Sequence, residues 1–345
     1  MTDQIRGRAR GEADVPLSVL DLATVSEGGT ATDALRTSTE LVRQAERWGY
    51  HRYWVAEHHG MPSVASSSPA VLIAHLAAHS ESIRLGSGGV MLPNHPPLIV
   101  AEQFATLHAL HPGRIDLGLG RAPGTDPATA SAMRRGDADA FPEEVAALAA
   151  FLDGEAPGGL QSYPLNADRP PIWLLGSSGF SAQLAGLLGL PFAFAHHFSA
   201  ENTEPALDLY RTRFRPSQWL DKPYAMIGVS AVAADTSEQA RRLARTLALA
   251  MLRLRRGRPS PIPSPEEAEA YPYSDVELSF VDGYLRNVVT GTGPEVRAGL
   301  SALRDRTEAD ELMITTGVYG GANRIRSYEL IAEAHRLTAS PSDSV

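Results

Sequence analysis

The sequence contains no cysteine, and this absence excludes several kinds of chemistry. A chain without cysteine has no disulfide, thiolate nucleophile, iron–sulfur ligand or cysteine-based zinc site. The 345 residues also lack any uninterrupted apolar run of the ~18 residues that a membrane-spanning helix needs. Residues 1–16 carry charges but no apolar core of a secretory signal. We therefore expect a cytoplasmic protein that does not enter a membrane.

Clustered positive charge is also scarce. The formal net charge is −9, and the one basic cluster, RLRRGR at 253–258, is interpreted as a solvated helix end. Nucleic acid is therefore not an expected partner, because no patch is dense enough to follow a phosphate backbone. The hydrophobic share of 43% and the charged share of 21% are typical of a globular enzyme.

A dinucleotide-binding fingerprint is missing too. The first apolar run leads into ATVSEGGTATD at 23–33, and the glycines of GLGRAPG at 118–124 have the wrong spacing and follow a later strand. An open Rossmann-type sheet is therefore disfavoured.

Short apolar runs instead alternate with helical periodicity, which is typical of βα units around a parallel sheet. The predicted strands are 17–22, 51–57, 83–92, 114–120, 171–177, 192–198, 225–234 and 311–319. The predicted helices are 32–48, 69–78, 97–110, 142–152, 181–188, 205–214, 237–254 and 323–337. Eight such pairs predict a single-domain α/β fold, a (β/α)8 TIM barrel over 15–338, between flexible tails at 1–14 and 339–345. Long insertions after strand four (121–141) and after helix seven (256–285) are candidate lids.

Strand two ends in the triplet Glu57, His58 and His59. Reactive groups of such barrels gather at the carboxyl ends of the strands, and side chains alternate along a strand. His58 is therefore expected to face the barrel mouth, opposite to its two neighbours, where it can exchange protons near neutral pH. Taken alone, the triplet is equally compatible with a metal pair or a structural histidine.

Other histidines do not predict a metal site. His75 and His79, and likewise His108 and His111, have helical spacing, but no carboxylate is placed as in H-E-x-x-H. We interpret both pairs as packing or surface residues. His196 and His197 end strand six, and with Glu57 and His59 they are candidates for a substrate pocket.

Glycines and an arginine follow strands three to five. Gly88 and Gly89 interrupt strand three, which marks either a barrel bulge or a close approach of a ligand ring. Gly120 and Arg121 end strand four, where Arg121 pairs either with an anion or with a loop acid such as Asp126. Ser177, Ser178, Gly179 and Ser181 lie where a helix begins, a setting suited to phosphate or to ordinary serine capping.

Three segments carry a family resemblance: WVAEHHGMP, the run from LGSGGVMLPNHPP to GRIDLGLGRAPGTD, and LLGSSGFSAQLAGLLGLPFAF. In their order and spacing the chain resembles the luciferase-like flavin-dependent monooxygenases, over nearly the whole barrel. The resemblance implies that reduced FMN is bound and that His58 is the catalytic histidine. It implies a cis peptide at Gly88–Gly89 under the flavin ring, and phosphate contacts at Arg121 and around Ser178, Gly179 and Ser181. Gly120 stands where luciferase has a reactive cysteine, so light emission is not expected.

The resemblance further implies a homodimer and a separate NAD(P)H-dependent reductase that supplies the reduced flavin. From it we predict a monooxygenase that transfers one oxygen atom of O2 to a small or medium apolar organic substrate. Two alternatives stay open: a deazaflavin-dependent oxidoreductase that transfers hydride, and a barrel that binds flavin without turnover. FMN is a phosphate monoester, so one phosphate site is sufficient to bind it. The reaction of reduced flavin with oxygen requires a site that excludes water and can close.

Overall fold

A closed parallel barrel forms the centre of the computed structural model, which describes residues 5–7, 9–133, 135–166 and 168–339. Its strands pair in the order β10-β1-β2-β3-β5-β6-β7-β8, and β8 closes the ring against β10. The barrel strands are β1 (Leu17–Asp21), β2 (Arg52–Val55), β3 (Arg84–Ser87), β5 (Ile115–Gly120), β6 (Ile172–Gly176), β7 (Phe192–Phe194), β8 (Ala225–Ala233) and β10 (Glu311–Thr315). Each lies within one of the eight predicted strands, so the predicted TIM barrel is confirmed. Most are buried along their whole length, as parallel strands covered on both faces must be.

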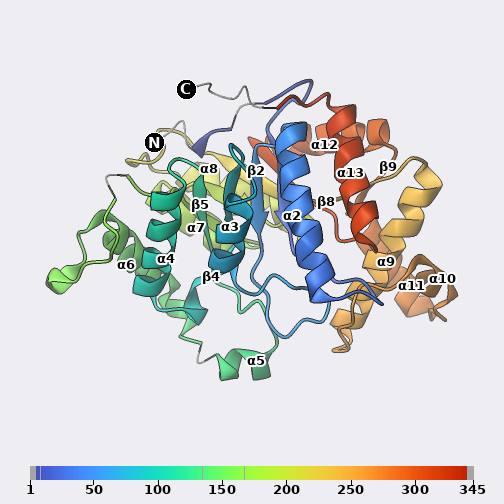
Figure 1. Cartoon of the computed structure of the whole chain (residues 1–345), viewed down its shortest axis with the longest axis horizontal. Helices are drawn as coiled ribbons and strands as arrows, with labels where there is room; N and C mark the ends of the chain where they lie inside the picture. The colour runs from blue at the N-terminus through green and yellow to red at the C-terminus, as the bar shows by residue number, and fades with distance from the viewer. Residues whose placement is uncertain (1–4, 8, 134, 167, 340–345) are drawn as a thin grey trace.

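Eight helices surround the barrel, each contacting its neighbours in the ring or the strands beneath. They are α2 (Ala31–Trp48), α3 (Pro69–Ala77), α4 (Pro97–Leu110), α6 (Phe141–Asp153), α7 (Gly179–Leu188), α8 (Thr203–Arg213), α12 (Gly293–Thr307) and α13 (Gly321–Ala334). Figure 1 shows α2 and α13, the first and last of them, side by side. Helix α2 illustrates how the sequence sets the bounds: Thr30 and Asp33 form a capping box at its start, and Gly49 ends it with φ 94°.

The helix predicted at 237–254 does not belong to this ring, which corrects the assignment of helix seven. It forms α9 (Ser237–Arg255), and the chain continues through α10 (Pro265–Ala270), α11 (Asp275–Leu285) and the short strand β9 (Val289–Gly291). Helices α10 and α11 pack on α9, and β9 pairs with the end of β8. The ring position between α8 and α13 is taken by α12. The insertion therefore precedes the seventh ring helix, and most of it is helical.

Shorter elements fill the other connections. The segment after β5 contains α5 (Pro127–Ala132), capped by Asp126, and a 3-10 turn η2 (Ala138–Ala140). Helix α5 projects at the lower edge of Figure 1. Between β3 and α4 lie β4 (Val90–Met91), which pairs with β5, and η1 (Leu92–Asn94). The remaining 3-10 turns are η3 (Pro157–Gly159) and η4 (Ala200–Asn202). None of the described helices combines the length and the apolar character needed to cross a bilayer.

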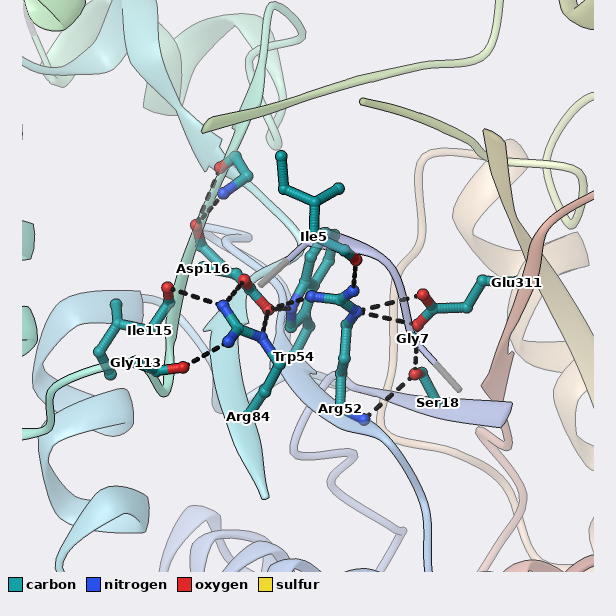
Figure 2. A network of polar contacts seen from close by, with 12 residues as sticks. Ile5, Gly7, Ser18, Arg52, Trp54, Arg84, Gly113, Ile115, Asp116 and Glu311 are labelled. Carbon is teal, nitrogen blue, oxygen red and sulfur yellow. Dashed lines mark hydrogen bonds and ion pairs between the residues drawn. The ribbon is translucent and has the colours of Figure 1, made fainter. Parts of the chain in front are cut away.

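A buried charge network fills the amino-terminal end of the barrel (Figure 2). Arg52 lies between Glu311, at 3.0 Å from its Nε, and Asp116, at 2.8 Å from its Nη1. Arg84 also pairs with Asp116, and Ser18 donates to Glu311. Burial alone would raise the pKa of Asp116, but the Arg84 and Arg52 guanidiniums outweigh it and lower that pKa. These charges are therefore satisfied by one another rather than by water.

The described residues before β1 belong to the packed structure. Ile5 is fully buried, and its carbonyl accepts a hydrogen bond from Arg52. Glu12 pairs with Arg297, and its N–H donates to the carbonyl of His335. The prediction of a flexible tail over 1–14 therefore does not hold for residues 5–7 and 9–14. Residues 1–4, 8 and 340–345 lie outside the described residues.

Candidate active site

A cavity of about 340 Å³ opens at the carboxyl ends of the barrel strands. Its wall draws on strand ends from most of the barrel and on α9 and α11 of the insertion. Nine of the predicted site residues line it: His58, Gly88, Gly89, Gly120, Arg121, Ser177, Ser178, Ser181 and His197. Their convergence follows from the fold, because all carboxyl ends of a parallel barrel meet at one face. Both predicted insertions also reach the wall, the first through Arg121, Ala122 and Gly124 and the second through Tyr284.

The triplet after β2 divides as the strand alternation predicts: His58 lines the cavity, whereas Glu57 and His59 do not. The Glu57 carboxylate is fully buried and accepts hydrogen bonds from the Met91 N–H at 3.0 Å and from the His95 ring at 2.9 Å. His59 contacts the same carboxylate at 2.9 Å. Burial would raise the pKa of Glu57, but the hydrogen bonds from His95 and His59 outweigh it and lower the pKa. Glu57 thus fixes the end of β2 to the segment after β3 and holds His58 in place.

The imidazole ring of His58 is not fully hydrogen-bonded within the described part of the chain. Its Nδ1 is buried without a hydrogen-bond partner in the described part of the chain. Burial lowers the pKa of His58, although the nearby Glu57 carboxylate acts in the opposite direction. A lowered pKa favours the neutral imidazole, and the ring lines the cavity.

Gly88 and Gly89 lie between β3 and β4, and the peptide bond that joins them is cis, as the resemblance implies. The Gly88 N–H donates to the Val55 carbonyl at 2.8 Å. A Cβ at Gly89 would come within 2.8 Å of the Gly118 carbonyl oxygen, so a side chain there would collide with β5. This part of the cavity wall is consequently bare backbone.

Arg121 and the start of α7 form the cationic end of the cavity. The guanidinium lies 4.1 Å above the Phe180 ring, and the described residues give it no acidic partner. Asp126, the alternative partner considered from the sequence, instead caps α5 through the N–H groups of Ala128 and Thr129. Ser178 is the N-cap of α7 but makes no side-chain capping bond, which leaves the first N–H groups of the helix available. An anion can therefore bind between Arg121, these N–H groups and the serine hydroxyls.

Four predicted site residues are not brought to the cavity wall: Glu57, His59, Gly179 and His196. Glu57 and His59 pair with each other behind it, as described above. The His196 ring is buried against Thr203, with its Nδ1 2.8 Å from the Thr203 hydroxyl. Gly179 is the first residue of α7 and does not line the cavity. These positions correct the expectation that Glu57, His59 and His196 line the substrate pocket.

Sequence reasoning missed the residues that line the opposite side of the cavity. They are Met226, Gly228 and Ser230 of β8, Leu247 and Met251 of α9, Tyr284 of α11, and Met313 and Thr315 of β10. No motif marks them, because they come from distant segments and their shared wall exists only in the closed barrel. The alternation of β8, with Met226, Gly228 and Ser230 two residues apart, is the one signal in the sequence that they share a face.

The sequence model of the luciferase-like monooxygenases matches residues 15–309. The chain belongs to this family. Among its relatives, the Bacillus subtilis protein YvbT is 50% identical over 93% of this chain and 96% of its own length. A luciferase-like monooxygenase of Escherichia coli is 46% identical over 92% and 96%. The N-acetyl-S-alkylcysteine monooxygenase of Bacillus subtilis is 34% identical over 93% and 98%.

Several solved structures share the barrel. Apo-MsnO8 superposes with a TM-score of 0.88 at 38% identity, over 94% of this chain and 98% of its own. The FMN complex of the oxygenating constituent of 3,6-diketocamphane monooxygenase, from Pseudomonas putida, has a TM-score of 0.69 at 19% identity, over 93% and 97%. An F420-dependent secondary alcohol dehydrogenase has a TM-score of 0.68 at 15% identity, over 94% and 100%. At such identities the last two likenesses show the fold alone.

Proposed function

We propose that this protein is the oxygenase component of an FMN-dependent monooxygenase. Reduced FMN comes from a separate NAD(P)H-dependent reductase, one atom of O2 enters a small or medium apolar organic substrate, and the other leaves as water. The observation that carries the proposal is the pairing, in one cavity, of a neutral histidine with an unpaired arginine beside an uncapped helix start. Family membership and the monooxygenase names of the relatives support it.

The residues present fit FMN. Arg121, Ser177, Ser178, Ser181 and the first N–H groups of α7 would hold its phosphate, because they provide positive charge and uncommitted donors at one end of the cavity. Gly88 and Gly89 would lie against the ring system, since their bare backbone leaves a surface that a flat ring can approach closely. When bound in its reduced form, FMN supplies the electrons that activate O2.

His58 would be the catalytic residue of this chain. Its ring lies in the cavity and is neutral near pH 7, so it can accept a proton or donate one at a nitrogen that faces the reacting molecules. Glu57 would act as a positioning residue through its hydrogen bonds to the segment after β3. The apolar side of the cavity would exclude water from the reaction.

A titration of the purified protein with flavins tests the proposal. We expect binding of FMN with two visible absorbance bands, whereas a deazaflavin enzyme would take up a coenzyme with a single band. Arg121→Ala should weaken FMN binding about tenfold or more, because a charged hydrogen bond contributes roughly 1.5–3 kcal/mol. The same substitution should leave riboflavin binding unchanged, since riboflavin has no phosphate. Arg43→Ala, in a half-exposed surface pair, is the control.

Two outcomes would reject the FMN proposal. One is the absence of FMN binding, and the other is an equal loss of riboflavin and FMN affinity in Arg121→Ala. We also propose a homodimer, which is supported by exposed apolar side chains on α3 and α4.

A further inference from the structure

The cavity has two chemically different ends. Arg121 carries the only permanent charge among the described residues that line it, and it lies at the end formed by β5 and α7. The opposite wall, formed by β8, α9, α11 and β10, contributes no acidic or basic side chain. A molecule bound against this wall would lose its hydration without gaining a counter-charge, so a charged group would be strongly disfavoured there.

His197 supplies a fixed hydrogen-bond acceptor beside this wall. Its Nδ1 lies 2.9 Å from the Gly228 carbonyl oxygen, and its backbone N–H donates to the same oxygen at 3.0 Å. A carbonyl can only accept, so in the neutral ring Nδ1 carries the proton and Nε2 presents a lone pair. Burial lowers the pKa of His197 to about 4, so the ring is neutral near pH 7.

The Nε2 atom is free to receive a ligand. It has no hydrogen-bond partner in the described part of the chain, and His197 lines the cavity. A Cβ at Gly228 would come within 2.9 Å of the His197 ring, so glycine at this point of β8 leaves the space that the imidazole occupies. The ring is therefore held in one orientation and one tautomer.

Ser230 and Tyr284 bring two hydroxyl groups close together in the same wall. The Ser230 hydroxyl of β8 is buried and has no hydrogen-bond partner of good geometry in the described part of the chain, although it lies close enough to the Tyr284 hydroxyl to influence the pKa of that phenol. Burial is the larger influence and raises the pKa of Tyr284. A buried hydroxyl without a partner costs free energy, so this pair offers polar contacts to a bound molecule.

Apart from Thr315, the rest of the wall is apolar and adaptable. Three of the seven methionines of the chain, Met226, Met251 and Met313, belong to it. Methionine side chains are unbranched and polarisable, and they adjust to apolar groups of different shape. This lining can accommodate aliphatic groups of different shape rather than a single rigid ligand.

We propose that the wall formed by β8, α9, α11 and β10 is the substrate subsite, and that it selects an uncharged aliphatic molecule whose head donates a hydrogen bond to Nε2 of His197. The inference rests on the proposed function, because it assumes that the cofactor takes the opposite end of the cavity. His197 is accordingly a specificity-determining residue, and Ser230 and Tyr284 are secondary polar contacts. The proposed substrate class is therefore an apolar chain that carries one O–H or N–H donor.

Calorimetric titration with ligands of matched size tests this proposal on the FMN-loaded and on the cofactor-free protein. Octan-1-ol has a donor, its isomer 1-methoxyheptane has none, and octanoate and octylammonium carry opposite charges on the same tail. We expect octan-1-ol to bind about tenfold more tightly than the ether and at least tenfold more tightly than either ion. The proposal fails if octan-1-ol does not bind, or if the ether or an ion binds as tightly.

Two variants locate the effect at Nε2. His197→Asn keeps a donor toward the Gly228 carbonyl, but its shorter amide places no acceptor at the position of Nε2, so it should weaken octan-1-ol binding about tenfold and leave the ether unaffected. His197→Gln extends an amide oxygen to about the position of Nε2 and should restore most of the affinity. Unchanged octan-1-ol binding in His197→Asn would overturn the assignment. FMN affinity should be unaffected in both variants, so a failure of the subsite is distinguishable from the failure of FMN binding itself.

Discussion

At the scale of single residues, the surroundings of His58 differ sharply from those of the residues beside it. Glu57 and His59 are joined by a hydrogen bond, and Glu57 is further committed to the segment after β3. The His58 ring lines the cavity with a buried Nδ1 that has no partner in the described chain. Glu57 and His59 therefore serve to position the chain, and His58 remains available for chemistry.

Removing this ring should therefore separate binding from turnover. We expect His58→Ala to keep FMN affinity within severalfold while lowering product formation by roughly a hundredfold, the effect of losing a general acid–base group. The measurement is product yield from a panel of small and medium apolar molecules that carry one O–H or N–H donor, with reduced FMN from a generic reductase. Arg43→Ala, in a surface pair on α2, is the control. An unchanged yield in His58→Ala would remove His58 from the mechanism.

The sequence indicates the orientation of His58 but not the environment of His197. Alternation along a strand suffices for the first, because strand ends keep a period of two. The tautomer of His197 depends on the Gly228 carbonyl, 31 residues away, which approaches it only when β7 and β8 pair. Contacts of this kind carry no local pattern, so the two consecutive histidines 196 and 197 look equivalent in the sequence.

At the scale of secondary-structure elements, the insertion between β8 and α12 differs most from the sequence prediction. The strongly amphipathic α9 resembles a ring helix, and the proline-rich stretch after it resembles a loop. Only part of the apolar face of α9 lies against β8 and β9, and α10 and α11 cover the rest through Leu249, Leu252, Ala268 and Val281. An amphipathic pattern predicts that one face of a helix is buried, but it does not predict which element covers that face. The predicted lid is consequently a packed wall that brings Tyr284 to the cavity.

Helix α3 has the opposite character, since apolar side chains extend onto its exposed face. Val71 is 72% exposed, and on the neighbouring α4 Leu110 is 65% exposed. A surface helix that is apolar nearly all round is typical of one covered by another chain. The homodimer that we propose would bury this face against a second copy.

A charge on α3 should therefore prevent dimerisation. We expect Val71→Asp to shift the protein from dimer to monomer in size-exclusion chromatography with light scattering, because an unpaired charge is costly in an interface. Val276→Asp on α11 places the same change at a site that is 79% exposed and should leave the dimer intact. A native protein that elutes as a monomer at micromolar concentration would contradict the dimer.

At the scale of the whole molecule, the two ends of the barrel have different roles. One end stabilises the fold, and the other carries the candidate active site. The candidate active site lies at the carboxyl ends of the strands, whereas the amino-terminal end is filled by the network of Arg52, Arg84, Asp116 and Glu311. Parallel barrels permit this division because all strands run in one direction. Burial raises the pKa of Glu311 even though Arg52 opposes it, so this carboxylate depends closely on its arginine.

We therefore expect Arg52→Met to lower the free energy of unfolding without changing the candidate active site. Without the guanidinium, Asp116 loses one of its two arginines and Glu311 loses its ion pair, and breaking a buried pair costs about 3–5 kcal/mol. Urea unfolding should show this loss, while FMN affinity of the folded variant stays within about twofold. Arg43→Met at the surface should change the free energy of unfolding by less than ~1 kcal/mol. An equally small change in Arg52→Met would mean that water or a shift of residues 5–7 compensates the carboxylates, and that the network does not stabilise the barrel.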